Sequence, residues 1–200
     1  MKKVVVAICG ASGTVYALRL LSALVLQPVH IYLIVSDTGS RLIEMETGIQ
    51  ADGLISWLRQ EVHFHEKAVI HPCGVDDFFT PPASGSFLHD GMVIVPCSMK
   101  TLASIASGVS DNLVLRCADV CLKERRKLIL VPRETPLSLV HLENMTAVSR
   151  AGALVLPAMP SFYMKPRTIE DLVDTVCARI LDHLQVDHSM GGRWGEEQNV

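Results

Sequence analysis

The fold is decided by the stretch Val4-Val5-Val6-Ala7-Ile8-Cys9-Gly10-Ala11-Ser12-Gly13-Thr14, which leads into a helical pattern. Its first part is short, apolar and largely β-branched, which is typical of a strand covered on both faces. The apolar residues that follow recur at the spacing of one helical stripe: Val15, Leu18, Leu21 and Val25. The stretch therefore predicts a buried strand, a turn of small residues and an amphipathic helix.

The turn between the strand and the helix, Gly10 to Thr14, contains only small residues. Small side chains let a ligand approach the backbone, and the unpaired N–H groups at a helix start favour an anion. The full dinucleotide fingerprint is missing, because its third glycine is absent. The turn therefore predicts the phosphate of a nucleotide or flavin near Ser12, with one phosphate favoured over two.

The composition describes one domain rich in aliphatic residues. The chain has 200 residues, of which 49% are hydrophobic and only 5% aromatic, and its net charge is −3. Such aliphatic mass suits buried parallel strands, and its excess predicts burial against sister subunits in a homo-oligomer. The longest apolar stretches fall short of the about 20 residues of a membrane span, and Met1-Lys2-Lys3 leads into a strand. We expect a cytoplasmic protein that binds neither membrane nor nucleic acid.

The cysteines and histidines do not show the paired spacing of a metal site. The six cysteines lie mostly within apolar patterns, which favours buried, reduced thiols: Cys9, Cys73, Cys97, Cys117, Cys121 and Cys177. His63 and His65 form a His-x-His pair, but no third ligand accompanies them, so we expect no metal. The basic cluster Lys123 to Lys127 is broken by Glu124 and is typical of a solvated helix end.

Four further segments have the pattern of buried strands: 30–35, 92–95, 128–131 and 153–156. Helical patterns separate them and end in a long helix over 168–184, whereas 53–80 carries the weakest pattern. Strands that alternate with helices predict a doubly wound parallel sheet of the Rossmann or flavodoxin type. No linker or repeat divides the chain, so we expect residues 1–200 to form a single α/β domain.

Polar side chains follow the predicted strands at the ends where the ligands of open α/β sheets collect. Ser36 follows the second strand, and Ser98 begins a helix directly after the third. Arg116 and Lys123 are seven residues apart, so they share a helix face and could receive one anionic group. The segment Pro81 to Phe87 is irregular and could form a second anion-binding loop.

Several short motifs resemble those of one enzyme family. They are Gly10-Ala11-Ser12-Gly13, Pro96-Cys97-Ser98-Met99-Lys100-Thr101, Leu122-Lys123-Glu124-Arg125-Arg126, Pro132-Arg133-Glu134-Thr135-Pro136-Leu137, His141-Leu142-Glu143-Asn144-Met145 and Phe162-Tyr163. In order and spacing they are similar to the flavin prenyltransferases of the UbiX type, over Val4 to Trp194. The resemblance implies an enzyme that joins the prenyl group of dimethylallyl phosphate to reduced FMN, without a metal. It also implies that prenylated FMN is released to a UbiD-type decarboxylase.

The resemblance further implies a dodecamer of flavoprotein domains, in which each site draws on several subunits. Carried over residue by residue, the FMN ligands would be Gly10, Ala11, Ser12, Ser36, Ser98, Met99, Lys100, Thr101 and Arg133. The ligands of dimethylallyl phosphate would be Ser84, Gly85, Arg116, Lys123, Tyr163 and Arg179. The remaining active-site positions would be Glu46, Glu134 and Trp194. The tail 185–200 is too polar to form core, so we expect it to pack on a neighbouring subunit.

The chemistry of these residue types fits the implied roles. Lys123 and its arginine partners can stabilise a departing phosphate, and we expect this electrostatic term to dominate catalysis. Tyr163 and Trp194 offer ring faces to a developing allylic cation. Proton transfer is expected from three further residues: Ser12, Glu46 and Glu134.

Two other interpretations remain open. A flavin-dependent decarboxylase of a cysteine-containing peptide would share the fold, but its segment after the last strand resembles Pro-x-Met-Asn. Here Pro157-Ala158-Met159-Pro160 lacks that asparagine. A non-catalytic FMN carrier or activating subunit of a decarboxylase would have no need of a second phosphate site, and would leave the cations Arg116, Lys123 and Arg179 unexplained.

Overall fold

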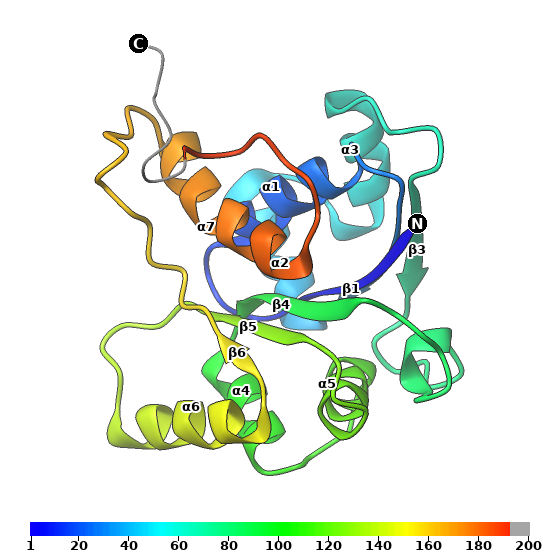
Figure 1. The fold of residues 1–200 in the computed structure, drawn as a ribbon, viewed down its shortest axis with the longest axis vertical. Helices are drawn as coiled ribbons and strands as arrows, with labels where there is room; N and C mark the ends of the chain where they lie inside the picture. Colours follow the sequence, from blue (N-terminus) through cyan, green and yellow to red (C-terminus); the bar gives the residue numbers. More distant parts are fainter. Residues whose placement is uncertain (193–200) are drawn as a thin grey trace.

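The computed structural model describes residues 1–192, which fold around one six-stranded parallel sheet (Figure 1). Its strands are β1 (Lys2–Ile8), β2 (Val29–Val35), β3 (Val69–Cys73), β4 (Gly91–Cys97), β5 (Leu128–Pro132) and β6 (Leu154–Val155). They lie in the order β3-β2-β1-β4-β5-β6, and each neighbouring pair is parallel. The predicted doubly wound parallel sheet is therefore confirmed.

The strand β3 was missed, because the sequence pattern indicated only five strands. It lies at the edge of the sheet, pairs with β2, and leaves two of its five residues exposed. Its sequence includes His71 and Pro72, and an edge strand tolerates proline because one of its sides needs no ladder hydrogen bonds. Without a continuous apolar run, β3 could not be recognised as a buried strand.

Helices cover both faces of the sheet (Figure 1). They are α1 (Thr14–Leu24), α2 (Asp37–Thr47), α3 (Leu54–Glu61), α4 (Met99–Ala106), α5 (Leu113–Lys123), α6 (Leu139–Ala151) and α7 (Ile169–Leu184). Two short 3₁₀ turns, Ala51–Gly53 and Pro81–Ala83, complete the elements of the described chain. The buried residues of α1, α2, α3 and α7 join one hydrophobic cluster, and those of α4, α5 and α6 join another. The domain thus has three layers with the sheet in the middle.

The strand β1 explains why the core has two halves. Val4, Val6 and Ile8 contact the cluster on the α1 side, whereas Val5 and Ala7 contact the cluster on the α5 side, and all five are fully buried. Alternate side chains of a strand point to opposite faces, so a strand with helices on both sides must be apolar throughout. The uninterrupted apolar run in the sequence is the direct consequence.

The helix α1 buries a wider stripe than predicted. Its buried residues are Thr14, Ala17, Leu18, Leu20, Leu21 and Leu24. Val15 was expected to face the core but is 39% exposed. The helix packs on α7 as well as on the sheet, and two contact surfaces require a broader buried face than one. The assignment of Val15 to the core was therefore wrong.

Two lysines anchor the end of α7 at the amino edge of the sheet. Lys2 Nζ donates to the carbonyl of Leu184 at 3.0 Å, and Lys127 Nζ donates to the carbonyl of His183. Cations near the last carbonyls of a helix also complement its dipole. The interpretation of the basic cluster as a solvated helix end was therefore wrong for Lys127, which holds two segments together.

The chain that follows α7 begins by returning to the core. Val186 is buried in the cluster on the α1 side, and Met190 packs against the same cluster. The first residues of the tail therefore contact their own domain. The prediction that 185–200 packs on a neighbouring subunit stays a prediction for the remainder, since residues 193–200, including Trp194, lie outside the described residues.

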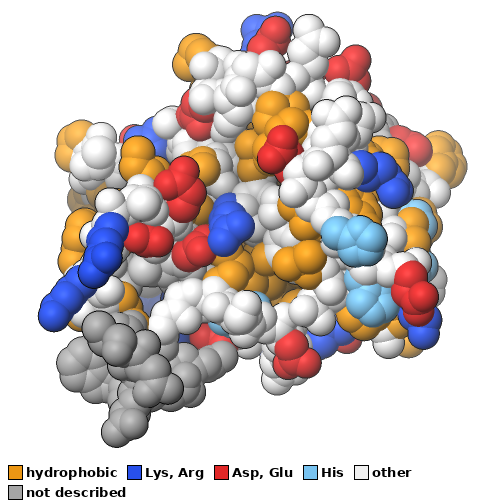
Figure 2. Space-filling view, turned by 90° about the horizontal axis from the view of Figure 1, so that it is seen from above, with side chains coloured by type: hydrophobic (Ala, Val, Ile, Leu, Met, Phe, Trp, Pro, Cys, Tyr) orange, Lys and Arg blue, Asp and Glu red, His pale blue; other side chains and the backbone are white. Residues whose placement is uncertain are grey.

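Two further features of the domain are its buried cysteines and its exposed surface. All six cysteines are buried and unpaired, and burial raises the pKa of Cys9 to about 11, so the expected reduced thiols are confirmed. No helix within residues 1–192 is long and apolar enough to cross a membrane. On the face seen in Figure 2, hydrophobic side chains are mixed with acidic and basic ones.

Candidate functional site

A pocket opens at the carboxyl edge of the sheet, between β1 and β4, where the topological switch point lies. We call it the switch-point pocket. β1 and β4 are neighbours in the sheet, but the connections that leave them run to opposite sides, and ligands of open α/β sheets bind at such a point. The pocket here has a volume of about 360 Å³. It is lined by residues that follow β1, β2 and β4, among them Gly10, Ser36, Thr38, Ser98, Lys100 and Thr101.

Three helices point their amino termini at this pocket. Ser36 caps α2 by accepting from the N–H of Gly39 at 3.1 Å, and Ser98 caps α4 by accepting from the N–H of Thr101 at 3.2 Å. Asn112 caps α5, and its side chain also lines the pocket. Helix amino termini carry partial positive charge and spare N–H donors, so their convergence favours an anionic ligand.

The amino terminus of α1 is occupied by the carboxylate of Glu46. Glu46 accepts from the N–H of Gly13 at 3.1 Å, and from both the N–H and the hydroxyl of Thr14 at 2.8 Å. Burial raises the pKa of Glu46, but hydrogen bonds from Thr14, Ser12 and Gly13 together lower it below its usual value. A side chain of the protein thus accepts the hydrogen bonds at the start of α1 in this structure, and the expectation of a ligand phosphate near Ser12 stays a prediction.

The turn after β1 is shaped by packing on both sides. A Cβ atom at Gly10 would lie 2.7 Å from Cβ of Thr38, so only glycine lets the turn approach α2 this closely. Gly13 has a φ of 107°, in the left-handed region that favours glycine. Arg133, beyond β5, donates from Nε to the carbonyl of Ser12 at 2.9 Å. Of the expected FMN ligands, Ala11 and Met99 are buried beside these turns.

A second group of expected site residues surrounds the segment 81–87. Arg116 donates from Nε to the carbonyl of Ala83 at 3.0 Å and pairs with Asp119 at 2.9 Å. Lys123 pairs with Glu124 at 2.6 Å, and a Cβ atom at Gly85 would lie 2.8 Å from Lys123 Nζ. The structure thus brings Arg116 and Lys123 to one loop, and their joint binding of an anionic group stays a prediction.

Arg126 was missed as an organiser of this loop. It donates to the carbonyl of Phe87 at 2.7 Å and to the carbonyl of Gly85. The interpretation of Arg126 as part of a solvated helix end was wrong, since its guanidinium holds the backbone beside Ser84. A sequence signal for this role would be an arginine close to an irregular segment that has unpaired carbonyls. The long side chain of arginine can reach such carbonyls even when they are far away in the sequence.

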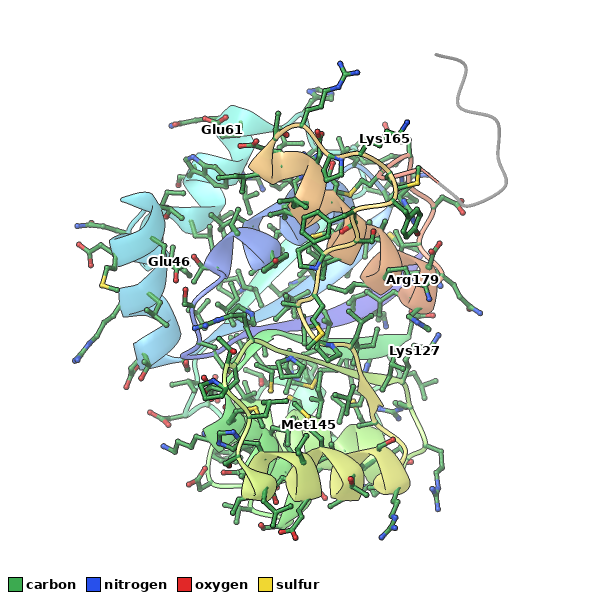
Figure 3. The ribbon with its side chains drawn as sticks, turned by 90° about the vertical axis from the view of Figure 1, so that its left-hand side faces the viewer. Glu46, Glu61, Lys127, Met145, Lys165 and Arg179 are labelled. Atoms are coloured by element: carbon green, nitrogen blue, oxygen red, sulfur yellow. The ribbon has the colours of Figure 1, made fainter. Side chains whose placement is uncertain are left out.

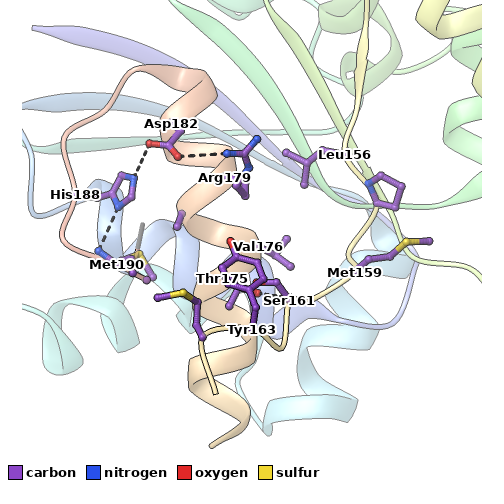
Figure 4. A pocket seen from close by; sticks show the side chains of 15 residues that line it. Leu156, Met159, Ser161, Tyr163, Thr175, Val176, Arg179, Asp182, His188 and Met190 are labelled. Atoms are coloured by element: carbon purple, nitrogen blue, oxygen red, sulfur yellow. Dashed lines mark hydrogen bonds and ion pairs between the residues drawn. The ribbon is translucent and has the colours of Figure 1, made fainter. Parts of the chain in front are cut away.

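A third group lies in a cavity beside α7 (Figure 4). The cavity has a volume of about 510 Å³ and is lined by the segment after β6, by α7 and by the tail up to Gly192. Tyr163 and Arg179, both expected to bind the substrate, line it together. Apolar side chains such as Leu156, Met159 and Val176 form much of its remaining wall.

The pocket, Lys123 and Arg179 do not meet within one chain. α5 and α7 lie on opposite faces of the sheet, and both begin at the carboxyl edge, where the pocket is. Lys123 is the last residue of α5, roughly 15 Å from its first at about 1.5 Å rise per residue. Figure 3 likewise shows Glu46, which contacts the turn at Gly13, far from Arg179. Lys123 and Arg179 therefore lie apart from the pocket, whereas Arg116 directly follows Leu115, which lines it.

Glu134 follows β5 at the carboxyl edge. Its carboxylate accepts from the N–H of Thr135 at 3.0 Å and is exposed. The position suits a group that must reach a ligand near the pocket at this edge, because Arg133 beside it contacts Ser12. Trp194 falls outside the described residues, so its expected place in the site stays a prediction. Among the described residues, no group of three or more histidine, cysteine or acidic side chains could hold a metal.

Comparison with known proteins first defines the class. A family model described as Flavoprotein matches residues 1–181, which include the whole sheet and the switch-point pocket. The fold and the pocket are thus those of a flavin-binding α/β protein.

Relatives that match nearly the whole chain identify one family within this class. A flavin prenyltransferase UbiX from Methanothermobacter thermautotrophicus is 45% identical over 97% of this chain and 96% of the relative. AnUbiX (PadA1), solved in complex with FMN and dimethylallyl pyrophosphate, has a TM-score of 0.87 and 43% identity over 98% of this chain and 99% of its own. A dodecameric FMN-dependent UbiX-like decarboxylase from Escherichia coli O157:H7 also gives 0.87, at 44% identity over 97% and 100%. The chain belongs to the family of UbiX-type flavin prenyltransferases.

Proposed function

We propose that this protein transfers the dimethylallyl group of dimethylallyl phosphate to reduced FMN and so makes prenylated FMN. The observation that carries the proposal is the near-full-length similarity to flavin prenyltransferases, one of which was solved with FMN and dimethylallyl pyrophosphate. Reduced FMN, when bound, supplies the nucleophilic ring atoms to which the prenyl group is joined. The protein's own residues must hold both ligands and stabilise the departing phosphate.

The switch-point pocket supports the flavin half of the proposal. Ser36 and Ser98 accept hydrogen bonds from backbone N–H groups, and Ser36 keeps its own hydrogen to donate to a ligand oxygen. The hydroxyls of Ser98 and Thr101 share a hydrogen bond of 3.0 Å, so one of their two hydrogens is left for another acceptor. Lys100 adds a positive charge at the same pocket, next to the start of α4. An anionic flavin with one phosphate and a polar ribityl chain matches these donors, and Arg133 and Glu134 would flank it from β5.

The cations outside the pocket support the substrate half. A prenyl phosphate reacts when positive groups stabilise the phosphate that leaves, and Arg116, Lys123 and Arg179 can supply them. Tyr163 would face the allylic cation, a contact that contributes about 1–2 kcal/mol when desolvated. Because that contribution is small compared with the barrier, we assign most of the catalysis to the electrostatic clamp on the phosphate.

The separation of these groups supports a site made by several copies of the chain. Lys123 and Arg179 lie on helices at opposite faces of the sheet, so a neighbouring copy must bring them to the flavin. Exposed apolar residues on α6, Leu139, Val140 and Leu142, offer contact area for such copies. We therefore propose a homo-oligomer, with a dodecamer as in the E. coli relative, and a UbiD-type decarboxylase as the recipient of the product.

The test is anaerobic incubation of the protein with reduced FMN and dimethylallyl phosphate, followed by mass spectrometry of the released flavin. We expect a flavin that is heavier by one five-carbon prenyl unit. Protein boiled before the incubation is the control for uncatalysed alkylation. Unmodified FMN, with both ligands bound to folded protein, would contradict the transferase and favour a non-catalytic FMN carrier.

A further inference from the structure

A tight turn over residues 84–87 lies beside the end of α5 (Figure 1). The N–H of Phe87 donates to the carbonyl of Ser84 at 3.2 Å, which closes the turn and places Gly85 and Ser86 at its tip. The N–H of Gly85 has no partner among the described residues, and the hydroxyls of Ser84 and Ser86 share one hydrogen bond of 2.9 Å. The tip therefore offers a backbone N–H and a hydroxyl hydrogen, which are groups that bind phosphate oxygens.

The two ends of this turn are anchored independently of its tip. Arg116 donates from Nε to the carbonyl of Ala83 at 3.0 Å, and Ala83 is buried. Phe87 packs against the buried cluster on the α5 side, and its ring meets that of Tyr32 edge-on with the centroids 4.9 Å apart. The core thus fixes the entry and the exit of the turn, and the tip depends on other contacts.

Arg126, three residues after the end of α5, supplies those contacts. Its two terminal guanidinium nitrogens donate to two carbonyls of the turn, to that of Phe87 at 2.7 Å and to that of Gly85. A guanidinium presents its donors in a rigid planar fork, so one side chain can fix two carbonyls at once. Both carbonyl oxygens are thereby directed at a positive charge and not at an anion bound to the tip.

The tip also lies directly against Lys123. A Cβ atom at Gly85 would lie 2.8 Å from Lys123 Nζ and would meet the carboxylate of Glu124, so only glycine lets the tip approach α5 this closely. Lys123 and Glu124 form an ion pair at 2.6 Å, and both side chains are partly exposed. The ammonium of Lys123 and the donors of the tip are therefore neighbours only while the tip stays against α5.

We propose that Arg126 is a positioning residue, which holds the tip of the turn against the end of α5 so that its donors and Lys123 form one subsite for the phosphate of the prenyl donor. This inference rests on the proposed function, in which Ser84, Gly85 and Lys123 bind that phosphate. Arg126 acts through the backbone of the turn and not by contact with the substrate. Without its fork, the ligand itself would have to order the tip, and the carbonyl of Gly85 would be free to turn toward the phosphate.

The test measures the dissociation constant of dimethylallyl phosphate from the full assembly loaded with oxidised FMN, by calorimetry and without turnover. Arg126→Ala should raise this constant about five- to thirtyfold, the range expected if the ligand must order about one further residue of the turn. Arg126→Lys should remain weakened by at least about threefold, because an ammonium cannot hold two carbonyls in the geometry of the fork. In both variants the dissociation constant of FMN should stay within about twofold of the original, a result that a general structural role would not give.

Arg125→Ala is the matched control. Arg125 is the exposed neighbour of Arg126, and its side chain forms no hydrogen bond or ion pair with the part of the chain that the structure describes. The change removes the same charge close to the same subsite but leaves the turn bound to Arg126. Binding of dimethylallyl phosphate should therefore stay within about twofold of the original.

Several results would overturn the inference. If Arg126→Lys binds dimethylallyl phosphate as tightly as the original, or if Arg125→Ala is weakened as much as Arg126→Ala, charge and not the fork explains the effect. An equal loss of FMN binding in the Arg126 variants would indicate a general loosening of the protein. Unchanged binding in Arg126→Ala would overturn the inference as well. Should Arg126→Ala fail to fold, Arg126→Lys decides the question by the same outcomes.

Failure of this inference and failure of the proposed function give different results. Binding of dimethylallyl phosphate without prenyl transfer in the mass spectrometric test would contradict the proposed function alone. Prenyl transfer with the Arg126 variants indistinguishable from the original protein would contradict the inference alone. If neither dimethylallyl phosphate nor inorganic pyrophosphate binds the original protein, the subsite beside Lys123 falls, and the inference with it.

Discussion

The pocket at the carboxyl edge of the sheet and the cavity beside α7 are built in opposite ways. The pocket combines the turns after β1, β2 and β4 with the first turns of α2, α4 and α5, all from one chain. The cavity combines the middle of α7 with an irregular segment and with the tail. Sheet topology thus dictates the pocket, whereas the cavity depends on segments that no topology rule determines.

This difference separates the part of the molecule that comes with the fold class from the part to which we assign the reaction. A switch-point pocket with hydroxyl-capped helices comes with the doubly wound fold and suits many flavin proteins. The cations Arg116, Lys123 and Arg179 do not line this pocket, and they lie on α5 and α7. Under the proposed function, prenyl transfer therefore depends largely on residues outside the flavin pocket.

The largest effect is expected at Lys123, which lies outside the flavin pocket. Lys123→Ala should slow prenyl transfer about 100- to 1000-fold, because a charged donor to the departing phosphate is lost. Its dissociation constant for FMN should stay within about twofold of the original value, since Lys123 does not line the flavin pocket. Stopped-flow spectroscopy of the flavin and fluorescence titration of FMN measure the two quantities.

Mixed assemblies make this prediction sharper. Lys100→Glu should weaken FMN binding, because Lys100 lines the pocket and the change reverses its charge. Co-assembly of Lys123→Ala chains with Lys100→Glu chains should recover part of the activity, as some sites then pair an intact pocket with an intact Lys123. Assemblies that stay as inactive as the parents would show that each chain builds its site alone.

A smaller effect is expected at Glu134, which lies at the carboxyl edge near the flavin pocket but is expected to act in the reaction. Glu134→Gln should slow turnover about 10- to 100-fold, because proton handling at the phosphate is lost. FMN binding should be unchanged, since the amide keeps the size of the side chain and its bond to Thr135. Single-turnover kinetics check this, and unchanged turnover would remove Glu134 from the mechanism.

The smallest effect concerns the stability of the flavin turn. Glu46→Gln should lower the free energy of unfolding by about 1 kcal/mol at neutral pH, because a charged acceptor at the start of α1 is lost and its exposure weakens the effect. The pKa of Glu46 is lowered in the folded protein, so its stabilisation is present above the pKa of an unfolded glutamate and is lost as the pH falls through the folded value.

Urea unfolding at neutral and at acidic pH tests this prediction. The two proteins should differ at neutral pH and converge in acid, where Glu46 itself becomes protonated. Glu44→Gln, on the exposed side of the same helix, is the control and should behave like the original protein. A difference that persists in acid would indicate that size or packing, rather than charge, explains the role of Glu46.

Glu46 also shows the limit of local sequence reasoning. The small residues after β1 and the start of α1 correctly indicate a site for an anion, because spare N–H groups attract one wherever they occur. Which anion arrives is decided by α2, whose last turn brings Glu46 to Gly13 and Thr14. A contact between residues more than thirty positions apart leaves no trace in a local pattern.

The sequence by itself determined the layers and the parallel sheet, because buried strands and amphipathic helices require apolar residues at periods that can be counted. It also determined the cap Ser98, since capping is local. Only the tertiary structure decided that β3 completes an edge, that Arg126 and Lys127 bind distant carbonyls, and that His188 lies 3.3 Å from the carboxylate of Asp182. Each of these depends on which segments meet in space, and that is a property of the whole fold.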